Sequence, residues 1–116
     1  MQSHAWVQEF AAGVTVCDTA GTILEMNDRA AQMFGKQGGR ALLGSNVLDC
    51  HPEPARTKLR TLMEERRANT YTVEKNGRRK LIHQAPWYRD GQYAGFVEIA
   101  LALPEAMPHF VRDGAT

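Results

Sequence analysis

The sequence LGSNVLDCHPEPARTKLRTLMEERR, at residues 43–67, decides the fold because it contains the one long helix expected in this chain. Proline fits the first turn of a helix, where backbone N–H groups have no helical partner, so Pro52 and Pro54 predict a helix over residues 52–67. Pro52 also keeps His51 extended, which places His51 at or beside the N-cap. The apolar residues of this segment recur at helical spacing and form its core-facing stripe: Ala55, Leu59, Leu62 and Met63. Extended back by one turn, the stripe reaches His51, whose imidazole is therefore the most informative chemical group of the chain.

Short strands and a short helix precede this segment. The sequence GVTVCDTAGTILEMN at residues 13–27 predicts two strands joined by a turn at DTAG, which is a β-hairpin. Asn27 is a good N-cap for a helix over DRAAQMF, and Gly35 is expected to end that helix. Residues 36–44 are rich in glycine and are expected to be irregular or to form a single helical turn.

Three more strands are expected after the long helix, because β-branched and aromatic runs alternate with strong turn signals. The expected strands are residues 70–75, 79–88 and 93–103, and the turns between them are Asn76-Gly77 and Asp90-Gly91. Loops this short force antiparallel pairing. The sequence therefore predicts an α+β protein with helices on one face of an antiparallel sheet.

Composition and charge narrow the class of protein. The chain has 116 residues, of which 43% are apolar and 23% charged, the balance of one ordinary globular domain. The net charge of +1 gives no general reason to expect nucleic acid or a membrane as the partner. Cys17 and Cys50 are the only cysteines and cannot form a disulfide framework, and no secretory or membrane-spanning segment is evident, so a cytoplasmic location is expected.

The segment GVTVCDTAGTILEMNDRAAQMFG at residues 13–35 resembles a PAS domain in its order of strand, Asp-x-x-Gly turn, strand and Asn-led helix. The helix after HPEP, the Asn76-Gly77 hairpin and the closing strand GFVEIAL fit the same family, so the likeness covers roughly residues 10–103. The resemblance implies a PAS-like five-stranded antiparallel sheet in the order 2-1-5-4-3, with short helices and one longer helix on one face. The expected parts are an N-terminal flanking helix at 1–11, the PAS domain at 12–103 and a C-terminal tail at 104–116.

The resemblance also implies a function. PAS domains are sensory and signal-transduction modules that hold haem, flavin, another small molecule or nothing, and that signal through flanking helices, dimerisation or an effector domain. The segment LLGSNVLDCHPEPARTKL is similar to bacterial PAS domains that accompany haemerythrin-like or LytTR-type partners. The expected function is therefore binding of a small ligand or cofactor between sheet and helices. The ligand is unknown, and haem is the leading single candidate.

His51 is the leading candidate site residue, as an axial ligand of a haem iron. His83 is the second, because alternation places it on the same strand face as Leu81 and Trp87. Either histidine also has a structural explanation, as a helix cap or as the partner of a nearby carbonyl or a neighbouring strand. The apolar residues expected to line the pocket are Leu59, Leu62, Met63, Val73, Leu81 and Trp87.

Other chemistry finds little support in the sequence. The potential zinc ligands lack the spacing of zinc sites: Cys17, Cys50, His51 and His83. Because no carboxylate pair, Ser-His-acid set or phosphate loop can be assembled, the chain is not expected to be an enzyme. Glu25 and Glu98 lie in strand-like runs, and both are expected to face solvent.

Two basic clusters, Arg66-Arg67 and residues 78–80, are expected to be solvated surface rather than a contact with nucleic acid. Glutamates close in sequence dilute their positive charge: Glu64, Glu65 and Glu74.

Trp6 and Phe10 lie one turn apart on a short N-terminal helix that Ser3 is expected to cap. This apolar pair is expected to be buried, either against its own domain or against a second copy of the chain, and a homodimer is expected.

The core distinguishes two possible functions. A filled core would favour a ligand-free interaction or dimerisation module. A cavity of several hundred Å³ with His51 or His83 pointing into it would favour ligand binding.

Overall fold

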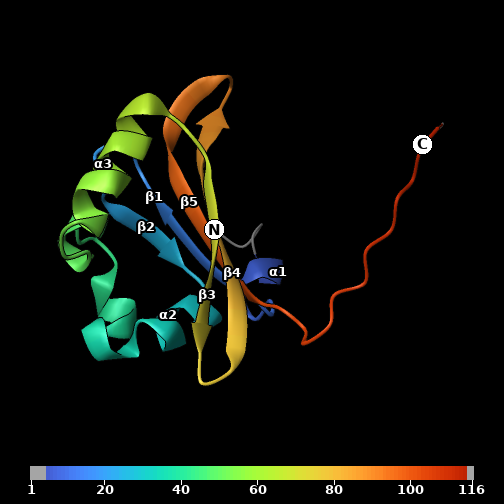
Figure 1. The fold of residues 1–116 in the computed structure, drawn as a ribbon. Helices are drawn as coiled ribbons and strands as arrows, with labels where there is room; N and C mark the ends of the chain where they lie inside the picture. The colour runs from blue at the N-terminus through green and yellow to red at the C-terminus, as the bar shows by residue number, and fades with distance from the viewer. Residues whose placement is uncertain (1–4, 115–116) are drawn as a thin grey trace.

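A five-stranded antiparallel sheet in the order β2-β1-β5-β4-β3 forms the centre of the computed structural model, which describes residues 5–114 (Figure 1). The strands are β1 Gly13–Cys17, β2 Ile23–Met26, β3 Asn69–Lys75, β4 Arg78–Arg89 and β5 Gln92–Ala102. Both the predicted α+β class and the predicted strand order are confirmed. The turn residues Asn76 and Gly77 have φ of 54° and 75°, the left-handed pair that a two-residue hairpin requires.

Helices and 3₁₀ turns cover one face of the sheet (Figure 1). The helices are α1 Ala5–Gln8, α2 Asp28–Met33 and α3 Ala55–Glu65, and the 3₁₀ turns are η2 Gly35–Gln37, η3 Gly39–Leu42 and η4 Val47–Cys50. The expectation of helices on one face holds for α2 and α3, whereas α1 lies toward the other side of the sheet, where β1 begins. The expected cap at Ser3 lies outside the described residues.

Helix α3 begins three residues later than predicted, at Ala55 rather than Pro52. A proline disfavours the helical conformation of the residue before it, so neither His51 nor Glu53 can be helical and the helix starts only after Pro54. His51 is therefore not at the N-cap; it is extended, with φ −116° and ψ 117°, and it ends η4. Leu59, Leu62 and Met63 are buried as predicted, but Ala55 is exposed because the helix has barely begun there.

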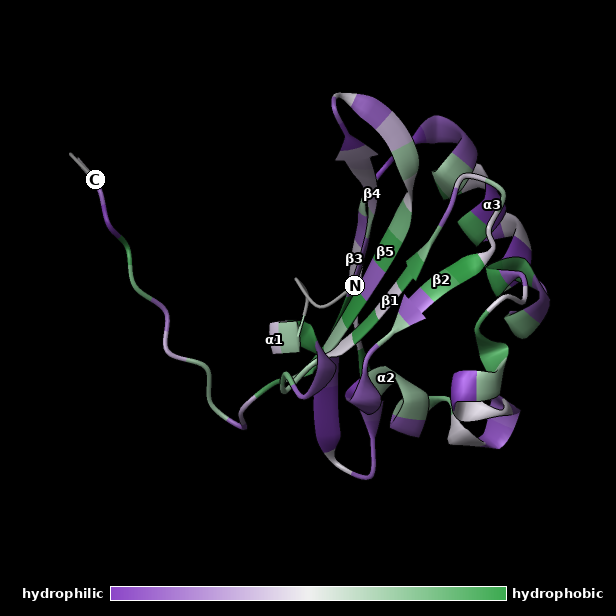
Figure 2. Ribbon diagram, turned by 180° about the vertical axis from the view of Figure 1, so that it is seen from behind, coloured by the Kyte–Doolittle hydropathy of each residue, from purple (hydrophilic) through white to green (hydrophobic). Residues whose placement is uncertain are grey.

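The hydrophobic core lies between α3 and the sheet. One buried cluster consists of Cys17, Leu59, Leu62, Met63 and Phe96, and a second of Ile23, Met26 and Ala30. Figure 2 shows the hydrophobic residues gathered on β1, β2 and β5, while the tip of the β3–β4 hairpin is hydrophilic. Within residues 5–114, no helix is long and apolar enough to cross a membrane.

Asn27 connects three segments of the chain from a position that is only 2% exposed. Its Oδ1 accepts hydrogen bonds from the backbone N–H of Val14 at 2.9 Å and of Ala30 at 3.0 Å, the second being the predicted N-cap of α2. Its Nδ2 donates to the carbonyl oxygens of Val7 at 2.9 Å and Ala12 at 2.7 Å. One side chain therefore holds α1, β1 and α2 together.

Candidate functional site

A cavity of about 40 Å³ lies between α3 and the centre of the sheet. Much of its wall is apolar and comes from β1, β2 and β5 together with η3 and α3. This part includes Cys17, Ile23, Met26, Leu42, Leu59 and Phe96. Space of this size admits only a few non-hydrogen atoms; for comparison, an engineered cavity of about 150 Å³ binds benzene.

A row of polar side chains crosses the sheet beneath this cavity. Asn69, Gln84, Glu98 and Thr15 lie directly opposite one another on β3, β4, β5 and β1, so all four share the face that α3 covers. Asn69 Nδ2 donates to Gln84 Oε1 at 3.1 Å, and Gln84 Nε2 donates to Glu98 Oε1 at 2.9 Å. Gln84 is 6% exposed and Thr15 is 8% exposed. We call these four residues the polar row.

Glu98 was expected to face solvent, and that expectation is wrong. Its side chain is half-buried, lines the cavity and accepts the hydrogen bond from Gln84. Gln84 and Thr15 were not predicted as site residues at all. The pattern that reveals them is the pairing of strands, since each of the four residues is the polar partner of another across the sheet.

His51 lines the cavity from the loop before α3. Its Nδ1 lies 2.8 Å from the Val47 carbonyl oxygen, and since a carbonyl can only accept, Nδ1 carries the hydrogen. The Nε2 atom is then the ring nitrogen that does not take part in this hydrogen bond. The bonded carbonyl matches the structural explanation of this histidine, while the position at the cavity keeps it a candidate ligand-binding residue.

Some of the other predicted pocket residues lie on the cavity side of the sheet, and the rest lie on the opposite side. Leu59 and Met63 line the cavity, and Leu62 lines an adjacent groove. Val73 shares the cavity face of the sheet but lies toward the tip of the hairpin, where it is 42% exposed. Leu81, His83 and Trp87 do not line the cavity, because they alternate with Gln84 and point to the opposite face.

His83 and Trp87 are held on that opposite face by hydrogen bonds of their own. The hydroxyl of Thr70 on β3 lies 2.7 Å from His83 Nδ1, which is the cross-strand partner of the structural explanation. Trp87 Nε1 donates to the Cys17 carbonyl oxygen at 3.0 Å. Neither side chain is placed to contact a ligand in the cavity.

A groove of about 280 Å³ adjoins the cavity, between α3 and β3. His51, Leu59 and Gln84 line both spaces, so these side chains separate them. Lys58 and Tyr71 line the groove but not the cavity. Burial and the Glu98 carboxylate raise the pKa of Tyr71, which keeps its phenol protonated at neutral pH.

Cys17 and Cys50 also line the cavity. Burial raises the pKa of both thiols, and the carboxylates of Asp18 and Asp49 add to the effect, so both cysteines stay protonated at neutral pH. Among residues 5–114, no three His, Cys, Asp or Glu side chains are grouped so that they could hold a metal ion.

The sequence profile of the PAS fold matches residues 7–105, which is most of the chain. This chain belongs to the PAS fold family. The comparison of the PAS domain with curated proteins gives no match.

Solved structures show the same fold. The C-terminal domain of a protein from Streptococcus mutans is 18% identical, with a TM-score of 0.71 over 87% of this chain and 82% of that one. The PAS domain of BvgS from Bordetella pertussis is 17% identical, with a TM-score of 0.66 over 89% and 85% of the two chains. The Aer2 receptor of Vibrio cholerae, described as a dual PAS-heme oxygen sensor, is 14% identical, with a TM-score of 0.59 over 80% and 95%.

Proposed function

We propose that this PAS domain is a sensory signalling module that binds a small organic molecule carrying a hydrogen-bond donor. In this proposal the body of the ligand occupies the groove between α3 and β3, and its donor group reaches the polar row through the small cavity. The domain spans residues 12–103, and the flanking segments 1–11 and 104–116 carry the signal to an effector domain or partner.

The polar row is the observation that supports this proposal. Burying a polar group costs free energy even when it is hydrogen-bonded, and a core that serves only for packing gains nothing from Glu98 or Gln84. Glu98 also provides the acceptor at the end of a chain of two hydrogen bonds, in which each donor faces the next acceptor. A ligand that donates to this carboxylate completes the row. The solved sensor proteins of the same fold agree with a sensory role.

Phenol and toluene test the proposal, because they share a ring and only phenol has a donor. In ¹H–¹⁵N NMR titrations of the full chain, phenol is expected to shift the resonances of Gln84, Glu98 and His51 at lower concentration than toluene does. Glu98→Leu should weaken phenol binding about 10-fold and leave toluene unchanged, since a hydrogen bond to a charged group contributes about 1.5–3 kcal/mol.

Glu25→Leu is the matched control, because Glu25 lies in strand β2 and is exposed. It should leave both affinities unchanged. Equal binding of phenol and toluene, or a Glu98→Leu variant that binds phenol as the wild type does, would contradict a role for the polar row in ligand recognition.

The second candidate function is a ligand-free interaction or dimerisation module. The small size of the cavity favours it, as does an exposed apolar pair formed by Trp6 in α1 and Phe10 just after it. Trp6 is 68% exposed and Phe10 is 51% exposed, with their rings 5.7 Å apart. In this case neither phenol nor toluene shifts the cavity resonances, and the apolar pair forms part of a homodimer interface.

Haem is the third candidate, and the residues around the cavity do not fit it. Pockets for drug-sized ligands hold roughly 300–1,000 Å³, and a porphyrin is a large ligand on this scale, whereas the cavity beside His51 holds about 40 Å³. The Nε2 atom of His51 is a suitable ligand atom, but the space beside it is not. His83 lies on the other face of the sheet.

Titration with haem is therefore expected to give a broad absorption band without a defined stoichiometry. The band should be the same in the wild type, in His51→Ala and in His83→Ala. A sharp Soret band at one haem per chain that disappears only in His51→Ala would show instead that α3 opens to admit a porphyrin.

A further inference from the structure

The β3–β4 hairpin presents a different charge on each of its two faces. Cross-strand partners share a face, so Lys75 and Arg78 lie on the cavity side of the sheet, and Lys80 lies there with Val73. Glu74 and Arg79 are also partners but lie on the other side, where Arg79 Nε is 3.4 Å from Glu74 Oε1. The glutamate expected to dilute this basic cluster therefore neutralises only one of its three cations.

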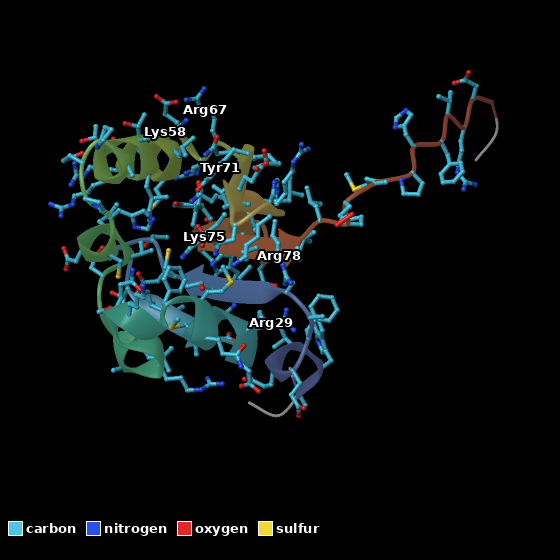
Figure 3. All side chains as sticks on the ribbon, turned by 60° about the horizontal axis from the view of Figure 1, so that its bottom comes forward. Arg29, Lys58, Arg67, Tyr71, Lys75 and Arg78 are labelled. Atoms are coloured by element: carbon cyan, nitrogen blue, oxygen red, sulfur yellow. The ribbon has the colours of Figure 1, made fainter. Side chains whose placement is uncertain are left out.

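The cations on the cavity side have no such partner. The ion pairs among residues 5–114 join Arg40 to Asp28, Arg67 to Glu65 and Arg79 to Glu74. Lys75, Arg78 and Lys80 take part in none of them. In Figure 3, Lys75 and Arg78 lie on the same side of the molecule as Lys58 of α3 and Arg29 of α2, with Tyr71 among them.

Two apolar side chains lie within this basic surface. Tyr71 and Val73 are each 42% exposed, and both are on the cavity side of β3. Tyr71 lies at the groove beside α3, and Val73 lies closer to the tip of the hairpin. We call Tyr71, Val73, Lys75, Arg78 and Lys80 the basic hairpin face. An exposed aromatic and a β-branched residue surrounded by cations match the centre and rim of a protein interface.

We propose that the basic hairpin face binds an acidic amphipathic helix of a partner protein. From Tyr71 to Lys75 the strand rises about 13 Å, which is between two and three turns of an α-helix. A helix with a leucine stripe would cover Tyr71 and Val73, and the glutamates beside that stripe would pair with Lys75, Arg78 and Lys80. Nucleic acid fits less well, because single-strand surfaces offer several stacking aromatics along a basic groove, and this face has only Tyr71.

Two helical peptides of about 18 residues test the proposal. They share one leucine stripe and differ only in having Glu or Lys beside it. With the full chain, fluorescence anisotropy should show the Glu peptide binding about 10-fold more tightly than the Lys peptide, with the difference shrinking as salt rises. NMR shifts caused by the Glu peptide should map to residues 71–80.

The hairpin supplies its own control. The double variant Lys75→Glu and Arg78→Glu should weaken the Glu peptide about 10-fold or more and strengthen the Lys peptide. Arg79→Glu changes the charge one residue away on the opposite face, and it should alter either affinity less than about 2-fold. Tyr71→Ala should weaken the Glu peptide with little change in its salt dependence.

Three outcomes would overturn the proposal. The first is the absence of measurable binding of the Glu peptide, and the second is binding that maps to another surface or responds equally to Arg79→Glu. The third is tighter binding of an oligothymidine, lost in the double variant, which would make this face a nucleic-acid surface. Lys75, Arg78 and Arg79 do not line the groove, so the charge variants test this proposal separately from phenol binding.

Discussion

Asn27→Ala is expected to lower the free energy of unfolding by about 4 kcal/mol, or to prevent folding at 37 °C. The substitution removes four hydrogen bonds: two accepted by Oδ1 and two donated by Nδ2. It leaves the backbone groups of Val7, Ala12, Val14 and Ala30 without these partners at a site that is 2% exposed. Loss of the N-cap of α2 alone accounts for about 1 kcal/mol. Urea denaturation followed by circular dichroism measures the change.

Asn46→Ala is the matched control, because Asn46 also caps a short helix but lies nearer the surface. Its Oδ1 accepts from the Leu48 N–H and its Nδ2 donates to the exposed Ala20 carbonyl, so its loss should cost about 1 kcal/mol. Asn27→Asp keeps the acceptor but places an oxygen against the Val7 and Ala12 carbonyls, so it should be no more stable than Asn27→Ala. Equal costs for Asn27→Ala and Asn46→Ala would mean that Asn27 does not hold α1, β1 and α2 together.

Gly95→Ala is expected to destabilise the domain by about 4 kcal/mol or more. Gly95 has φ of +143°, which side chains disfavour, and a Cβ there would overlap the Cys17 carbonyl oxygen and come within 2.8 Å of the Asp18 backbone. That carbonyl also accepts the hydrogen bond from Trp87, which lies directly opposite Gly95. Relieving the overlap must therefore separate β1 from β5 or break the Trp87 bond.

Gly91→Ala separates the effect of the backbone angle from that of the overlap. Gly91 has φ of +78°, but a Cβ there meets nothing within 4 Å. The alanine variant should cost only about 1 kcal/mol, the usual penalty of the left-handed conformation. Thermal unfolding of the two variants side by side tests this difference, and near-equal midpoints would mean that the close approach of β5 to β1 is not what requires a glycine at position 95.

The strands and their turns could be predicted because their signals are local. Asn76-Gly77 and Asp90-Gly91 specify tight turns through their own backbone preferences, and Asn27 specifies a helix start by the chemistry of its side chain. The start of α3 could also have been predicted locally. The rule that was applied to His51 before Pro52 applies equally to Glu53 before Pro54, and it disfavours a helical Glu53. These residues explain why the α+β class was right, whereas the strand order followed from the resemblance to PAS domains.

The polar row could not be predicted from turns alone. Counting back from the Asp90-Gly91 turn places Gln84 opposite Val97, with Glu98 one residue out of line. The register shifts between Trp87 and Tyr88, and this irregularity brings Gln84 opposite Glu98. Such a shift depends on contacts across the sheet, here the approach of Gly95 to β1, which no local pattern records.

Which face of β4 points to the cavity also depends on contacts across the sheet, so it could not be predicted from the local sequence. Alternation correctly placed His83, Leu81 and Trp87 on one face of β4. It could not predict which side of the sheet that face is on. The size of the cavity depends on how completely Leu59, Met63 and Phe96 fill the space under α3, which a sequence pattern does not determine. The absence of enzymatic activity, the cytoplasmic location and the homodimer stay predictions.

The central position of β5 joins the candidate site to the C-terminal segment of the chain. The strand is bonded to β1 on one side and to β4 on the other, and it continues into Leu103, whose N–H donates to the Arg79 carbonyl oxygen. Glu98 lies in β5, five residues and about 17 Å of extended chain before Leu103, so no turn lies between them. A displacement of Glu98 by the proposed ligand would therefore reach the C-terminal segment along one continuous strand, without passing through a loop.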